Sequence, residues 1–80
     1  MIEVKVVSAE WCSQCTPFKK TLRQSGIEYT SIDADDVNNA EFIRKHGVRG
    51  LPTTLIFEEG LLVKTIAGPK AQEVKDFLCK

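Results

Sequence analysis

The 80-residue sequence lacks a long apolar run, an excess of charge of either sign, and an abundance of cysteine. No apolar run approaches the roughly 20 residues that a membrane-spanning helix needs. Eleven Lys plus Arg residues balance eleven Asp plus Glu residues, whereas proteins that bind nucleic acids or anionic membranes normally carry a basic excess. We therefore expect no nucleic-acid partner and no membrane partner.

The first residues also lack a basic segment followed by an apolar stretch, so we expect no secretory signal and predict a cytoplasmic protein. A reducing compartment disfavours structural disulfides. The chain has three cysteines, an odd number, and Cys12 and Cys15 are three positions apart. This usage indicates redox or metal chemistry rather than a disulfide framework.

What is present is ordinary globular composition, with 42% apolar and 28% charged residues. The length predicts a single domain over residues 1–80. Alternating and helical apolar patterns, with Gly and Pro at the breaks, predict strands and helices in the order β-α-β-α-β-β-α. The expected ranges are 2–7, 13–24, 27–32, 37–46, 53–57, 61–66, and a last helix opened by Gly68 and Pro69.

This order restricts the architecture. The first β-α-β unit requires a parallel strand pair with a right-handed crossover, and the short turn at Glu58-Glu59-Gly60 predicts an antiparallel hairpin. The predicted fold class is therefore α/β, a four-stranded mixed sheet with helices on both faces.

The Cys12-Ser13-Gln14-Cys15 segment lies at a predicted strand-to-helix junction. A thiolate at Cys12 would face the unpaired N–H groups and the positive dipole end of the helix, which makes Cys12 the candidate nucleophile. Cys15, one turn further, would be shielded and could attack a mixed disulfide held on Cys12. Half of a zinc site is one alternative, but closed sites want four ligands, and Cys79 and His46 are not at a suitable spacing. A vestigial or purely structural pair is the other.

Pro52 directly precedes a predicted strand. Such a proline can adopt the cis form in a tight turn, and it would leave the backbone groups of Leu51 free to pair with a visiting peptide. An ordinary strand-initiating proline is the alternative.

These segments together resemble the thioredoxin/glutaredoxin superfamily over nearly the whole chain. The segments 9–15, 48–53 and 55–60, and the later Gly68, resemble the thioredoxin active site, cis-proline segment and terminal hairpin. The length, and the start directly on the first β-α-β unit, resemble glutaredoxins instead. The Cys-Ser-Gln-Cys-Thr segment is similar to small redoxins that feed electrons to ribonucleotide reductase.

The resemblance implies a protein-disulfide reductase without a cofactor or metal, acting as a monomer. Cys12 would be the attacking thiol and Cys15 the resolving thiol. Trp11, Leu51, Pro52 and Gly68 would shape a groove for a disulfide-containing substrate protein. The electron donor would be a flavoprotein reductase of the thioredoxin-reductase type or glutathione.

The chain also departs from the family pattern. Val6 stands where thioredoxins carry a buried aspartate, and Ser13-Gln14 is neither of the common dipeptides between the cysteines, which tune the redox potential. The glutathione-binding residues look incomplete, which favours the flavoprotein donor. A glutathione-dependent glutaredoxin and a redoxin-fold adaptor subunit stay open as alternatives.

Other residues are expected to play lesser roles. Cys79 is interpreted as a bystander thiol, with intermolecular disulfide formation as the alternative, and His46 as a solvated helix-end cation. One of the aspartates at 33, 35 and 36 is expected to cap a helix. The basic strip of Lys19, Lys20 and Arg23 is interpreted as a solvated helix face that could also orient an acidic partner.

Overall fold

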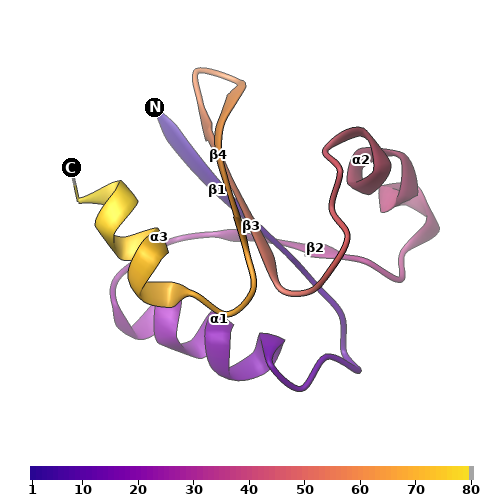
Figure 1. Ribbon diagram of the computed structural model, residues 1–80, viewed down its shortest axis with the longest axis horizontal. Coiled ribbons are helices and arrows are strands. Elements are labelled where there is room, and N and C mark those ends of the chain that lie inside the picture. The colour runs from indigo at the N-terminus through magenta and orange to yellow at the C-terminus, as the bar shows by residue number, and fades with distance from the viewer. Residues whose placement is uncertain (80) are drawn as a thin grey trace.

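The computed structural model describes residues 1–79 and has the predicted order of strands and helices (Figure 1). The predicted domain range ends at Lys80, which lies outside the described residues. The elements are β1 (Ile2–Ser8), α1 (Cys15–Gln24), β2 (Thr30–Asp33), the 3-10 helix η1 (Val37–Asn39), α2 (Ala40–Lys45), β3 (Thr53–Glu58), β4 (Leu61–Ala67) and α3 (Ala71–Leu78).

The four strands form one mixed sheet in the order β2-β1-β3-β4. β1 pairs in parallel with β2, and the β1–β3 and β3–β4 pairs are antiparallel. Helices α1 and α3 cover one face, and α2 lies on the other (Figure 1). The predicted mixed sheet with helices on both faces is confirmed.

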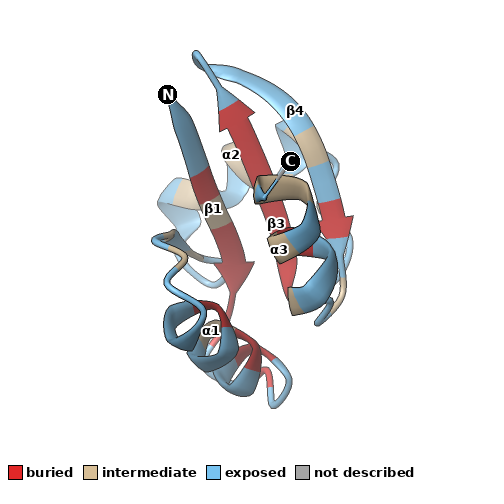
Figure 2. Cartoon of the chain, turned by 90° about the vertical axis from the view of Figure 1, so that its left-hand side faces the viewer, coloured by how far each residue is buried: buried red, intermediate tan, exposed pale blue. Residues whose placement is uncertain are grey.

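The two central strands carry the core because both of their faces are covered. Residues 53–57 of β3 are all buried, whereas β4 is mostly exposed (Figure 2). Neighbouring residues of β1 serve opposite faces: Val6 packs in a cluster with Leu22 of α1 and Val74 of α3, whereas Val7 packs with Leu55 and the half-buried residues of α2. Strand alternation therefore divides the core into two layers.

The second strand begins later than predicted. Ile27 closes helix α1 instead: its N–H donates to the Leu22 carbonyl, and the Gly26 N–H donates to the Arg23 carbonyl. Gly26 has φ +79°, which completes a Schellman motif at the helix end. The apolar side chain of Ile27 packs against the core from this turn, so regular pairing starts only at Thr30.

The helices also differ from the predicted ranges at their starts. Helix α1 begins at Cys15 rather than Ser13, and α3 begins at Ala71, two residues after Pro69. The segment after β2 first forms η1, and the Asp36 side chain accepts a hydrogen bond of 2.9 Å from the Asn38 N–H. An aspartate cap is thereby confirmed. Among the described residues, none of the helices is long and apolar enough to cross a membrane.

Strand β4 forms one edge of the sheet and contains an irregularity. Ile56 lies opposite Lys64, but Phe57 lies opposite Leu62. Val63 is therefore an extra residue on β4, as in a β-bulge. Leu61, Leu62 and Val63 are all exposed beside it.

Candidate active site

The structure joins Cys12 and Cys15 in a disulfide, and their Cα atoms are 5.4 Å apart. Cys15 is the first residue of α1, and Cys12 lies in the turn that leads from β1 into this helix. The turn is closed by two backbone bonds, from the Cys12 N–H to the Ala9 carbonyl and from the Cys15 N–H to the Cys12 carbonyl. The predicted strand-to-helix junction thus carries both sulfur atoms.

The start of helix α1 has no compensating negative group. Gln14 is the N-cap residue, but its side chain makes no capping bond, and the first turn contains no acidic residue. A helix N-terminus carries a partial positive charge and N–H groups without partners in the helix. This end of α1 therefore favours the thiolate form of Cys12 once the disulfide is reduced.

The two sulfur-bearing residues differ little in exposure. Cys15 is 1% exposed and Cys12 is 7% exposed, so Cys15 is slightly the more shielded of the two. Cys12 is nevertheless more deeply set than an attacking thiol on an open surface would be. Both residues pack with Ala9 and against the half-buried Leu51.

A pocket of about 430 Å³ lies beside Cys12. Trp11 and Leu51, two of the predicted substrate-binding residues, line it together with Cys12. Val48, Arg49 and Gly50, from the segment that resembles the cis-proline segment, also line it. The sequence did not point to the other three lining residues, which are Val7 of β1, Ala34 and Ile43. The wall is mostly apolar, with Arg49 as its one cation.

A hydrogen bond fixes the indole at the rim of this pocket. Trp11 Nε1 donates to Asp35 Oδ2 at 2.8 Å, although the ring is largely exposed. The sequence indicates Asp35 only as a possible helix cap. Its contact with Trp11 depends on the parallel β1–β2 pairing, which brings the ends of the two strands together.

Pro52 and Gly68, the other two predicted substrate-binding residues, do not line this pocket. The Leu51–Pro52 peptide bond is cis, as the sequence predicted. Pro52 is fully buried, and its carbonyl accepts a hydrogen bond of 2.8 Å from the Gly68 N–H. Within residues 1–79, neither the N–H nor the carbonyl of Leu51 takes part in a hydrogen bond, which leaves both for a visiting peptide.

The expected lack of a buried carboxylate at position 6 is visible in the packing. Val6 is fully buried in the apolar core. The nearest buried polar side chain along β1 is Ser8, whose hydroxyl accepts from Lys19 Nζ at 3.0 Å. Over the described residues, no three His, Cys, Asp or Glu side chains are grouped as they would be to hold a metal ion.

Two further residues singled out by the sequence lie outside the site. Cys79 is exposed and free. His46 is half-buried rather than fully solvated: its ring makes edge contacts with Phe42 at 4.5 Å and Phe57 at 5.5 Å between centroids. The ring therefore packs against two aromatic side chains, whereas a solvated side chain was expected.

The sequence of this chain is similar to those of known proteins. The thioredoxin family model matches residues 4–80. The thioredoxin of Buchnera aphidicola is 34% identical over 77 residues, covering 88% of this chain and 69% of that protein. The Bacillus subtilis thioredoxin is 31% identical over 71 residues, covering 81% and 66%. The chain thus spans about two thirds of the length of these relatives.

Solved structures show the same fold. A Fasciola hepatica thioredoxin superposes with a TM-score of 0.85 at 20% identity, covering 98% of this chain and 78% of that one. The short form of spinach chloroplast thioredoxin f gives a TM-score of 0.86 at 18% identity, covering 98% and 73%. With the family model matching almost from end to end, the chain belongs to the thioredoxin family.

Proposed function

We propose that the chain is a thiol-disulfide oxidoreductase that reduces disulfide bonds of other proteins by dithiol exchange. The observation that carries the proposal is the Cys12–Cys15 disulfide at the uncapped start of α1, beside a pocket lined by Trp11 and Leu51. Curated relatives named thioredoxin support the same chemistry.

The reaction begins with the reduced protein. The Cys12 thiolate attacks one sulfur of the substrate disulfide, the substrate S–S bond breaks, and the second substrate sulfur leaves as a thiolate that takes a proton. The Cys15 thiol then loses its proton and attacks Cys12 Sγ. The mixed disulfide breaks, the first substrate thiol is released, and the Cys12–Cys15 disulfide forms. Two electrons and two protons have then passed to the substrate.

The surroundings assign a role to each residue near the pair. The pocket beside Cys12 accepts the segment that carries the substrate disulfide, and the free backbone groups of Leu51 pair with that segment. Pro52 follows the pocket residue Leu51 in the chain, and the hydrogen bond from the Gly68 N–H to the Pro52 carbonyl holds this end of the loop in place.

A thioredoxin-reductase-type flavoprotein is the proposed donor that reduces the Cys12–Cys15 disulfide again, with glutathione as the rival. Activity with glutathione and its reductase, and none with the flavoprotein, would reverse this assignment. We also propose that the protein works as a monomer. We place it in the cytoplasm, because a disulfide reductase needs a reducing compartment. Sedimentation and cell fractionation test these two points.

Insulin reduction with dithiothreitol tests the activity. Cys12→Ser is expected to abolish it, because no thiolate remains to attack. Cys79→Ser is the matched control and is expected to keep full activity, because Cys79 is exposed and lies directly after α3. A Cys12→Ser protein as active as the parent would exclude the proposal.

A variant without the resolving thiol serves to identify the substrate. Cys15→Ser blocks the second step, so that substrates stay covalently attached to Cys12. Ribonucleotide reductase is one candidate, on the resemblance of the Cys-Ser-Gln-Cys-Thr segment to small redoxins. A trap that captures no protein, while Cys12 is shown to be reactive, would contradict a protein substrate.

A further inference from the structure

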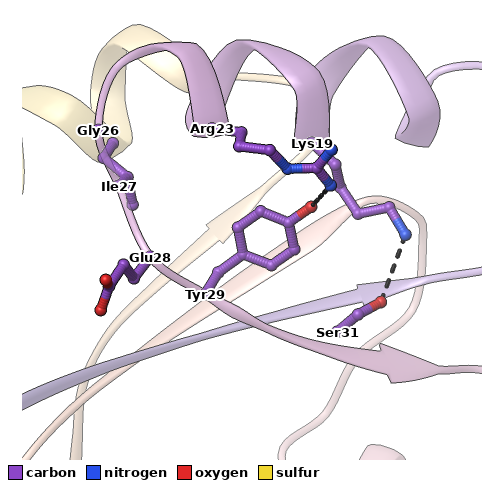
Figure 3. Close-up of a pocket in the computed structure, with 7 residues that line it drawn as sticks. All are labelled: Lys19, Arg23, Gly26, Ile27, Glu28, Tyr29 and Ser31. Atoms are coloured by element: carbon purple, nitrogen blue, oxygen red, sulfur yellow. Dashed lines mark hydrogen bonds between the residues drawn. The ribbon is translucent and has the colours of Figure 1, made fainter.

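A second pocket, of about 770 Å³, lies between helix α1 and the segment that leads into β2 (Figure 3). Lys19 and Arg23 project into it from α1, and Tyr29 and Ser31 border it from the strand side. This pocket shares no lining residue with the pocket beside Cys12. It is therefore a separate surface of the molecule.

The two cations in this pocket contact hydroxyl groups only. Arg23 Nη2 donates to Tyr29 Oη at 2.9 Å, and Lys19 Nζ donates to the hydroxyls of Ser8 and Ser31 at 3.0 and 3.3 Å. Throughout residues 1–79, the ion pairs involve Met1 and Lys5, not these two cations. Because guanidinium and ammonium groups carry several N–H donors each, both keep donors for a ligand.

Three acidic residues lie around the two cations, but within residues 1–79 none of them forms an ion pair with Lys19 or Arg23. Glu28 lines the same pocket, and its carboxylate points away from the Arg23 guanidinium (Figure 3). Glu10 and Asp33 line an adjoining pocket together with Lys19. Lys19 is half-buried, which reduces solvent screening of its charge relative to a free surface lysine. The pocket therefore presents unpaired positive charge to whatever enters it.

Strand β2 adds a second kind of binding group. It pairs with β1 on one side and is the last strand of the sheet on the other. The outward edge of β2 therefore presents backbone N–H and C=O groups of the kind that accept an additional strand. The Asp33 carbonyl is an exception, because it already accepts hydrogen bonds from the Asp36 N–H and from Asn39 Nδ2. Ser31 is the parallel partner of Val6, so its side chain lies on the face of the sheet that α1 covers.

The geometry of the edge and the cations fits together. Lys19 and Arg23 are four residues apart on α1, a rise of about 6 Å along the helix. Two residues of an extended strand advance about 6.6 Å, and their side chains point to the same face. A strand added beside β2 would thus place alternate side chains beneath the two cations.

We propose that the free edge of β2 binds an extended acidic segment of a partner protein as a fifth strand, with carboxylates two residues apart pairing with Lys19 and Arg23. The backbone hydrogen bonds of β2 supply affinity that does not depend on sequence. The two cations select acidic side chains at alternate positions. The partner leaves the pocket beside Cys12 free, so both surfaces can be occupied together.

Synthetic peptides test the proposal on the full chain. The probe is a Thr- and Val-rich peptide with two glutamates separated by one valine, and its matched control carries glutamine at both positions. Binding is followed by NMR titration of the labelled protein. We expect shifts at residues 29–33, slower hydrogen exchange of the outward β2 amides, and affinity at least about tenfold higher for the glutamate peptide.

Variants of α1 provide a second test of the role of the cations. Arg23→Gln is expected to weaken binding of the glutamate peptide about tenfold, while Lys20→Gln leaves it within about twofold. Lys20 is the matched control because it is exposed on the same helix but does not line the pocket. Far-ultraviolet circular dichroism confirms that both variants are folded.

Three results would overturn the proposal. The first is equal weakening by Arg23→Gln and Lys20→Gln, which would mean general charge attraction. The second is equal binding of both peptides with β2 protected, which would remove the role of the cations. The third is an identical response to free inorganic phosphate without protection of β2 amides, which would reduce the pocket to a small-anion site.

Discussion

The Gly68 N–H donates a hydrogen bond of 2.8 Å to the Pro52 carbonyl. This bond extends the β3–β4 ladder one residue beyond the Thr53–Ala67 pair. It connects the loop before β3, which borders the pocket beside Cys12, to the loop before α3. A change of backbone conformation at Gly68 therefore reaches the wall of the proposed substrate pocket.

Gly68→Ala is expected to lower the free energy of unfolding by at least about 1 kcal/mol. Gly68 has φ +91°, and a Cβ added there would meet Lys70 Cε only at 3.9 Å, so backbone strain rather than crowding is the cause. Gly50→Ala is the control, because Gly50 lies outside the left-handed region with no heavy atom within 4 Å of its Cβ position. Urea denaturation measures both, and equal losses would contradict the explanation.

Asp35→Ala is expected to change the fluorescence of Trp11, the single tryptophan of the chain, by removing the acceptor of its indole N–H. Stability should change by less than about 1 kcal/mol, because the bond is exposed. Asp36→Ala is the comparison: it removes the η1 cap and should cost about 1 kcal/mol without altering the emission spectrum. Matching fluorescence changes in both variants would argue against the Trp11–Asp35 contact.

Thr16→Glu is expected to slow the alkylation of Cys12 by iodoacetamide at neutral pH about two- to fivefold. A carboxylate in the first turn of α1 competes for the positive helix end that favours the Cys12 thiolate. The rate is measured in a Cys15→Ser and Cys79→Ser background, so that one thiol remains. Gln24→Glu makes the same charge change at the other end of α1 and should leave the rate unchanged; equal slowing would assign the effect to net charge.

Leu22→Ala is expected to lower the free energy of unfolding by about 2–5 kcal/mol, because Leu22 is fully buried between α1 and the sheet. Leu61→Ala removes the same atoms from a side chain that is 71% exposed and should cost less than about 0.5 kcal/mol. Thermal and urea unfolding measure the two. A large loss at Leu61 would mean that β4 is covered in solution.

Local patterns were sufficient for the element order, the strand-to-helix junction at Cys12 and the hairpin after β3. They were wrong at the start of β2, because an apolar residue just before a strand can belong either to that strand or to the end of the preceding helix. Ile27 fits the strand pattern, but its backbone closes α1 through Leu22. Choosing between the two requires the position of the helix end relative to the core, which the sequence alone does not give.

The site was predictable where it is local and not where it depends on folding. Cys12 and Cys15 share one turn, and Leu51 and Pro52 are adjacent, so motifs identified them as candidates. The contacts of Asp35 with Trp11 and of Ile43 with the pocket beside Cys12 join segments far apart in the chain. These contacts depend on strand register and on the placement of α2, which no local pattern encodes.

The extra residue at Val63 makes the two edge strands of the sheet differ in how well they can pair with a further strand. A regular strand cannot keep its hydrogen-bond spacing across a bulge, so β4 discourages edge-to-edge pairing of copies despite the apolar side chains at Leu61 and Leu62. The opposite border has no such interruption along Lys5–Ser8 and Thr30–Asp33. A further strand can consequently pair with the sheet beside β2 but not regularly beside β4. The bulge thereby protects the protein against fibril formation through β4.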